Sequence, residues 1–123
     1  MTINSRGLAG QPILPYIDYR AYTGTDVYLD LTFLDHTGVG NIPQSISYQI
    51  DDMTNSVNMV PMTSVPVTGY QQTLQIPASV LTMTRQFQGS QICQVLITAL
   101  LGDGSNVSTV TVIELCAIQT PNG

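Results

Sequence analysis

Lysine is absent from this 123-residue sequence, and positive charge is scarce throughout. The three arginines, Arg6, Arg20 and Arg85, are outnumbered by eight acidic residues, which gives a net charge of −5. Proteins that bind nucleic acids or anionic membranes neutralise phosphate groups with clustered cations. The composition therefore predicts no nucleic-acid partner and no membrane partner.

A long apolar run is also missing. The longest such stretch, residues 95–101, is interrupted by Thr98 and is far shorter than the ~20 residues that a membrane-spanning helix needs. The first residues show no basic segment followed by an apolar one, which is the pattern of a signal peptide. We therefore expect a chain that is synthesised in the cytoplasm and does not span a membrane.

Charged residues of both signs make up only 9% of the chain, whereas about a quarter is usual. Because 43% of the residues are hydrophobic, the surface must be covered mainly by Ser, Thr, Gln and Asn. A chain of this length can bury roughly two-thirds of its unfolded surface around one core. The fold needs neither a metal ion nor a disulfide to be stable, and an uncharged surface repels partners only weakly.

Cysteine occurs twice, at Cys93 and Cys116. A hairpin turn centred on Gly104 would bring these two residues close together on neighbouring strands. A disulfide could then form after release from a reducing cell, but disulfide geometry is demanding and cytosolic thiols stay reduced. We favour two reduced thiols.

No set of residues indicates catalysis, a cofactor or a metal site. His36 is the only histidine and falls in a predicted loop, where we expect a solvated side chain. Asp51 and Asp52 are adjacent, so on a strand their side chains point to opposite faces and cannot act as an acid–base pair. Turn formation explains them better, and calcium held by scattered loop carboxylates is a minor alternative. We expect no enzyme.

The clearest structural signal is a hairpin over residues 91–115. Two apolar, β-favouring runs, 91–101 and 107–115, flank a short segment that contains two glycines, an aspartate, a serine and an asparagine. The first run is apolar on both alternating faces, which predicts a central strand covered on both sides. The second run alternates Thr and Val, which is typical of a strand with one wetter face.

Five further segments read as strands. Residues 26–35 alternate most regularly and place Val27, Leu29, Leu31 and Phe33 on one face. Pro61 is expected to end the fourth strand, and one helical turn is expected over residues 77–82. The predicted strands before the hairpin are residues 13–21, 26–35, 45–51, 56–60 and 68–76. Seven strands with regular turn signals favour an all-β, antiparallel sandwich.

The chain divides into three predicted parts: an extended N-terminal arm at residues 1–12, a sandwich at 13–117 and a C-terminal tail at 118–123. The arm contains Gly7, Gly10 and Pro12 and has little periodicity. An arm that becomes ordered against a neighbouring subunit and a frayed terminus are both compatible with this composition.

Tyrosine gives the only candidate contact residues. Four of the six tyrosines lie around the first predicted turn, namely Tyr16, Tyr19, Tyr22 and Tyr28. Exposed aromatic rings on a surface of low charge suit a contact with a protein or a sugar. Rings at the rim of the core are an equally good interpretation.

Three segments resemble small immunoglobulin-like or fibronectin type III-like structural proteins of tailed bacteriophages. They are Ser-Tyr-Gln-Ile-Asp-Asp at residues 47–52, Leu-Gln-Ile-Pro-Ala-Ser at 74–79 and Gln-Val-Leu-Ile-Thr at 94–98 with the Gly-Asp-Gly turn that follows. The likeness covers about residues 26–115. It implies an immunoglobulin-like β-sandwich and no catalytic residues.

The resemblance further implies a structural virion protein, located in the particle as a capsid decoration or a component of the head, neck or tail. Its partners would be the major capsid protein or neck and tail subunits, and it would be oligomeric in the assembly. The alternative is a β-sandwich module that binds a carbohydrate or a host surface through the loops at residues 36–42 and 102–106. A hydrolase ranks last, because no nucleophile, base and orienting group occur together.

Overall fold

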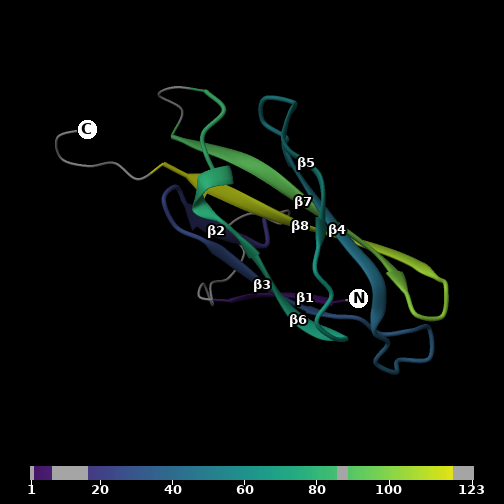
Figure 1. The fold of residues 1–123 in the computed structure, drawn as a ribbon. Helices are drawn as coiled ribbons and strands as arrows, with labels where there is room; N and C mark the ends of the chain where they lie inside the picture. Colours follow the sequence, from purple (N-terminus) through teal and green to yellow (C-terminus); the bar gives the residue numbers. More distant parts are fainter. Residues whose placement is uncertain (1, 7–16, 86–88, 118–123) are drawn as a thin grey trace.

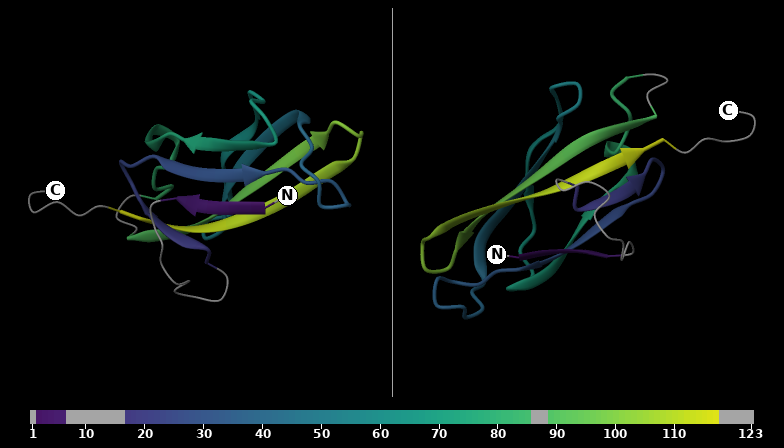
Figure 2. Two further views of the ribbon diagram at one scale, coloured as in Figure 1. Left: turned by 90° about the horizontal axis from the view of Figure 1, so that it is seen from below. Right: turned by 180° about the vertical axis from the view of Figure 1, so that it is seen from behind.

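The computed structural model describes residues 2–6, 17–85 and 89–117, which form two β-sheets packed face to face (Figures 1 and 2). The first sheet has three strands in the order β1-β3-β6, and both pairings are antiparallel. Its strands are β1 (Thr2–Arg6), β3 (Val27–Thr32) and β6 (Gln71–Ile76).

The second sheet has five strands in the order β2-β8-β7-β4-β5. Its strands are β2 (Tyr19–Tyr22), β4 (Pro43–Asp52), β5 (Val57–Val65), β7 (Ser90–Leu101) and β8 (Asn106–Cys116). Strand β2 pairs with β8 in parallel, and the other pairings are antiparallel. The all-β prediction is confirmed. The purely antiparallel arrangement is wrong, because β2, the first strand of this sheet along the chain, runs parallel to β8, the last one.

The core lies between the sheets and is built by alternate residues of the strands. Val27, Leu29 and Leu31 of β3 are buried, as the alternation predicted, and so are Leu74 and Ile76 of β6. The five-stranded sheet contributes Ile46, Tyr48, Ile50, Cys93, Val95, Ile97, Ile113 and Leu115. Burying each large aliphatic side chain contributes about 1.5–3 kcal/mol, so this layer dominates the stability of the fold.

Strand β1 lies inside the predicted arm of residues 1–12, where no strand was expected. It pairs in register with β3, from Thr2 opposite Thr32 to Arg6 opposite Tyr28. The segment Thr-Ile-Asn-Ser-Arg has one apolar residue and no alternation, so only its neighbour β3 explains why it is extended. Residues 7–16 and the tail at 118–123 lie outside the described residues, as do positions 13–16 of the first predicted strand.

Pro61 does not end the fourth strand, because β5 continues to Val65. β5 is an edge strand, and the pairing between β4 and β5 shifts register between Tyr48 and Ile50, opposite Pro61. A proline on an edge or at a bulge removes no ladder hydrogen bond. The prediction was wrong because it took no account of the edge position of the strand, which tolerates proline.

Strand β7 is central, as predicted, but only one of its faces is covered by the other sheet. Its residues alternate strictly between buried and half-buried from Gln91 to Leu101. The one helical element within the described residues is the short 3-10 turn η1 (Ala78–Val80), which lies in the segment expected to form a helical turn. In that part of the chain, no helix is long and apolar enough to cross a membrane.

Candidate interaction surface on the five-stranded sheet

A row of hydroxyl side chains crosses four strands on the outer face of the five-stranded sheet. Ser47 of β4 is opposite Ser64 of β5 on one side and opposite Thr98 of β7 on the other, and Thr98 is opposite Ser108 of β8. The neighbouring residues Ile46 and Ile97 are buried in the core. Because successive side chains of a strand point to opposite faces, the hydroxyls point outward.

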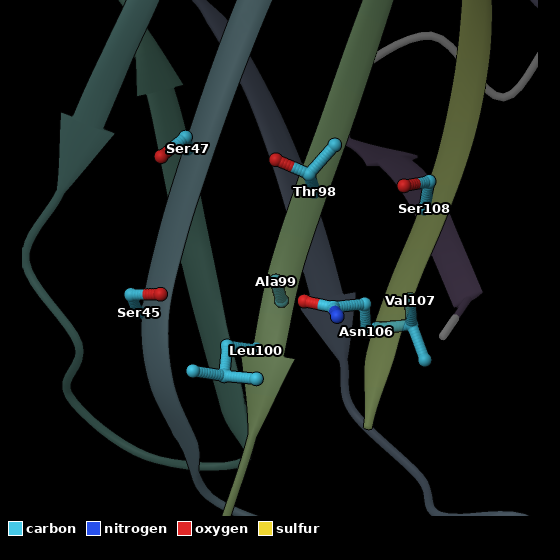
Figure 3. Close-up of a pocket in the computed structure, with 8 residues that line it drawn as sticks. All are labelled: Ser45, Ser47, Thr98, Ala99, Leu100, Asn106, Val107 and Ser108. Carbon is cyan, nitrogen blue, oxygen red and sulfur yellow. The ribbon is translucent and has the colours of Figure 1, made fainter. Parts of the chain in front are cut away.

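The hydroxyl row borders a shallow hollow of about 250 Å³ (Figure 3). In Figure 3, Ser45, Ser47, Thr98 and Ser108 lie around it on the same side of the strands. The hollow is lined by Ser45, Ser47, Thr98, Ala99, Leu100, Asn106, Val107 and Ser108. Within the described residues, the hydroxyls of Ser47, Thr98 and Ser108 bond to no other protein group. They can therefore donate to and accept from a partner.

Apolar side chains continue this face beyond the hydroxyl row. Gln49, Leu96 and Val110 form the next row across β4, β7 and β8. Val110 is 47% exposed, and Leu96 and Leu100 are half-buried. This end of the face mixes aliphatic groups with hydroxyls and carries no charge, and charged residues are depleted in the central part of protein–protein contacts.

Charged groups on this face are paired and lie at the opposite end of the strands. The Nε of Arg20 donates to Oε1 of Glu114 over 2.7 Å, and Glu114 is paired with Ile92 near the start of β7. Asp51 accepts hydrogen bonds from Gln49 and Asn58, each over 2.9 Å. The hollow at the other end of the strands is thus lined by uncharged residues alone.

Two loops meet beside the hollow, at residues 36–42 and 102–105 (Figures 1 and 2). The backbone N–H of Gly102 donates to Oδ1 of Asn41 over 2.8 Å, so the two loops are joined directly. A Cβ on Gly40 would lie 2.6 Å from the ring of Tyr70, so any larger residue here would force that ring to shift. Val39 and Ile42 remain about 60% exposed at the tip.

Aspartate side chains fix the shape of both loops. Asp35 accepts hydrogen bonds from the hydroxyl of Thr37 and from the backbone N–H groups of Thr37 and Val39. Asp103 accepts in the same way from the hydroxyl and N–H of Ser105. Because these bonds favour the charged carboxylate, the pKa of each aspartate is lowered. The loops are therefore held by local bonds rather than by burial.

The predicted tyrosine cluster is divided between the two sheets. Tyr22 ends β2 next to the buried Ala21 and is 41% exposed, so it points outward from the five-stranded sheet. Tyr28 lies between the buried Val27 and Leu29 and points outward from the three-stranded sheet. Tyr16 lies outside the described residues, and Tyr19 is placed only as part of the β2 backbone. A role for these four tyrosines in partner binding stays a prediction.

Asp51 and Asp52 point to opposite faces, as predicted. Asp52 is fully buried and accepts from the N–H of Thr54 over 2.9 Å and from the side-chain amide of Asn55 over 2.6 Å. Burial disfavours its charge, but hydrogen bonds from Thr84, Asn55 and Thr54 outweigh that effect and lower the pKa of Asp52. The residue organises the turn between β4 and β5, which confirms the interpretation as turn chemistry.

The cysteines are reduced and are not cross-strand neighbours. Cys93 is opposite Ile113, and Cys116 is opposite Ser90, because the hairpin turn is centred on Asp103 rather than on Gly104. Cys93 points into the core and Cys116 to the outer face, so the proposed proximity is wrong. Burial raises the pKa of the Cys93 thiol to about 11, which makes it a poor nucleophile.

Sequence reasoning missed a buried polar cluster next to Cys93. Gln91 is 1% exposed; it donates to Sδ of Met59 and to the carbonyl of Thr82, each over 3.3 Å, and accepts from the N–H of Thr84. The thiol of Cys93 lies 3.5 Å from Sδ of Met59. The cluster ties the segment before β7 to β5, and its polar groups are satisfied internally.

His36 is exposed in its loop, as expected. Among the described residues, no group of three or more His, Cys, Asp or Glu side chains is placed to hold a metal ion. Comparison of the sequence with protein-family models and with curated proteins finds no match. Functional inference therefore depends on the surface itself.

Proposed function

We propose that this protein is a non-enzymatic structural subunit, a component of a tailed-bacteriophage virion that binds neighbouring subunits through the outer face of its five-stranded sheet. The observation that carries the proposal is the uncharged hollow, with its row of hydroxyls that have no partner within the described chain. Hydroxyl groups surrounded by aliphatic side chains suit a neutral protein surface, which supplies hydrogen bonds and apolar contact together.

The finer fold that we propose is an immunoglobulin-like sandwich. The adjacent strands β3 and β6 correspond to B and E of that fold, and the neighbours β4, β7 and β8 correspond to C, F and G. Strand β5 takes the place that variable-type domains give to C′. The strand order thus supports the immunoglobulin-like fold that the resemblance of residues 47–52, 74–79 and 94–98 implies.

The virion assignment is tested by quantitative mass spectrometry of purified phage particles from the source. The measurement compares the copies of this chain with those of the major capsid protein. A ratio near parity assigns a role in covering the capsid, and a ratio many-fold lower assigns a role in the neck or tail. Absence of the chain from the particles overturns the assignment.

The binding face is tested by a matched pair of substitutions. Val110 on the face and Val39 in the loop are both exposed valines, so Val110→Lys and Val39→Lys introduce the same charge in two places. We expect V110K to reduce incorporation into particles at least tenfold, because a lysine inside an apolar contact loses its hydration without an opposite charge. Equal incorporation of both variants contradicts the proposed face.

A sugar- or host-binding module is the second candidate, and the joined loops favour it. The hydrogen bond between Gly102 and Asn41 brings together the two loops that the sequence singled out for this role. Glycan-array binding that is lost in V39K and kept in V110K would support this candidate. Absence of binding to every glycan removes it.

A further inference from the structure

The two sheets differ in strand number, and this leaves a second hollow at the side of the sandwich. It measures about 370 Å³ and lies between β5, the edge of one sheet, and β6, the edge of the other. Its lining contains no charged side chain: Tyr48, Thr63, Ser64, Val65, Pro66, Thr68, Gln72, Thr73, Leu74 and Gln75.

The two edges beside this hollow differ in how they are protected against pairing with another chain. β5 contains Pro61 and an irregular register opposite it, and both features deter the addition of a strand. β6, with the sequence Gln-Gln-Thr-Leu-Gln-Ile, has no proline and no charge, and its register with β3 is regular throughout. β6 is therefore the less protected edge, and only at its start does the side chain of Gln72 bond to the connection, at the carbonyl of Pro66 and the N–H of Thr68.

Strand β6 has a strand neighbour on one side only, within the described chain. The hollow lies on its other side and is lined by Leu74 of β6 and by the inward-facing Tyr48 of β4. A six-residue strand is about 20 Å long, which is enough for a regular ladder of backbone hydrogen bonds. Backbone pairing supplies affinity in such additions, and pockets for alternate side chains supply specificity.

We propose that an extended, uncharged segment of a partner protein adds to β6 as the fourth strand of the three-stranded sheet. Its alternate apolar side chains enter the hollow and contact Tyr48, Val65 and Leu74. The lining carries no charge, and this selects an uncharged occupant. An ionised side chain would lose its hydration in the hollow without gaining an opposite charge. The inference does not depend on the outer face or on a place in a virion.

A second copy of the chain is a poorer occupant than a partner segment. If two β6 strands paired with each other, the side chains available to fill the hollow would be those of the copy's own β6. Its apolar residues Leu74 and Ile76 are already buried, at 3% and 0% exposed, in their own core. A segment that brings unburied apolar side chains is required.

The test uses the full chain and a capped seven-residue peptide in which valine alternates with threonine and glutamine. Nuclear magnetic resonance titration follows the backbone amides of the labelled protein. We expect the signals of β6 and of the hollow-lining part of β5 to shift, and a peptide with proline at its centre to cause no shift. Absence of binding by the first peptide, or shifts confined to other strands, overturns the proposal.

A matched pair of variants locates the binding. Thr63 lines the hollow and is exposed, whereas the adjacent Met62 is exposed but does not line it. We expect Thr63→Arg to weaken peptide binding at least tenfold and Met62→Arg to leave it within twofold. Thr68→Arg, on the connection to β6, fills the hollow from another element and replaces T63R should that variant fail to fold. Equal binding by all variants, or a protein dimer that T63R abolishes, contradicts a partner strand as the occupant.

Discussion

Both faces of β7 carry apolar residues, but the surroundings of the two faces differ. On the inner face Cys93, Val95 and Ile97 are 0% exposed, since the three-stranded sheet covers them. On the outer face Leu96 and Leu100 are only half-buried, between neighbouring side chains of the same sheet. The difference shows that apolar content alone does not reveal a core, and that part of the apolar area on the outer face stays accessible to solvent.

The largest expected effect is on the inner face. Ile97→Ala removes a fully buried side chain from the centre of the five-stranded sheet, and we expect it to lower the free energy of unfolding by about 2–5 kcal/mol. Denaturant unfolding followed by circular dichroism measures this change. A loss below about 1 kcal/mol would mean that the inner face is not the close-packed side of the sheet.

The next effect compares two adjacent aspartates on opposite faces. Asp52→Ala removes a fully buried carboxylate that accepts hydrogen bonds from the N–H of Thr54 and the side-chain amide of Asn55, which we expect to cost about 1–3 kcal/mol. Asp51→Ala removes an acceptor that water can replace for the side-chain amide of Asn58, because both residues lie at the surface. We therefore expect a smaller loss. Denaturant unfolding of both variants under the same conditions checks that D52A loses more free energy of unfolding than D51A. Equal losses would contradict the structural role of Asp52.

The pH dependence of stability is a further test of the buried Asp52. Since the folded pKa of Asp52 is lowered, its charged form stabilises the fold at every pH above the unfolded value of about 3.9. That contribution is lost as the pH falls through the folded pKa. We therefore expect Asp52→Asn to flatten the decrease in unfolding free energy below about pH 4, relative to the parent protein. If the unfolding free energy of D52N decreased below about pH 4 as steeply as that of the parent protein, the lowered pKa of Asp52 would be contradicted.

The strand at residues 26–35 and the residues it buries could be predicted from the sequence. Val27, Leu29 and Leu31 repeat every second residue, a pattern that local geometry alone converts into a buried face. The Thr–Val alternation of β8 did not predict its inner face, because Thr111 is 4% exposed and Val110 is 47% exposed. Strand β1 and the parallel pairing of β2 with β8 could not be predicted in this way. Their partners are distant in sequence, and their own residues carry little periodicity.

The candidate surface was harder to predict because it depends on register. Ser47, Thr98 and Ser108 come from three strands, and they form a row only because the turn is centred on Asp103. The prediction that centred the turn on Gly104 misplaced Cys116 for the same reason. The tyrosines show the opposite error, since Tyr22 and Tyr28 are close in sequence but belong to different sheets. The sequence predicted only the two hairpin strands as neighbours, so the place of Ser47 beside Thr98 had no signal in it.

The smallest expected effect compares two threonines on the two faces of the five-stranded sheet. Thr111 on the inner face is 4% exposed, and its hydroxyl donates to Oδ2 of Asp18 over 3.0 Å. Thr111→Val should therefore lower the free energy of unfolding by about 1 kcal/mol. Thr98→Val on the outer face removes a hydroxyl that has no partner within the described chain, so we expect a change within about 0.5 kcal/mol.

The outer variant also separates stability from binding. Valine keeps the branched shape that suits a strand and removes only the capacity to form hydrogen bonds. If a neighbouring subunit uses the hydroxyl row, T98V should be incorporated into particles less well than the parent protein although it unfolds at the same denaturant concentration. A T98V protein that is clearly destabilised would show that the hydroxyl serves the fold, and the two faces of β7 would then differ less than their burial indicates.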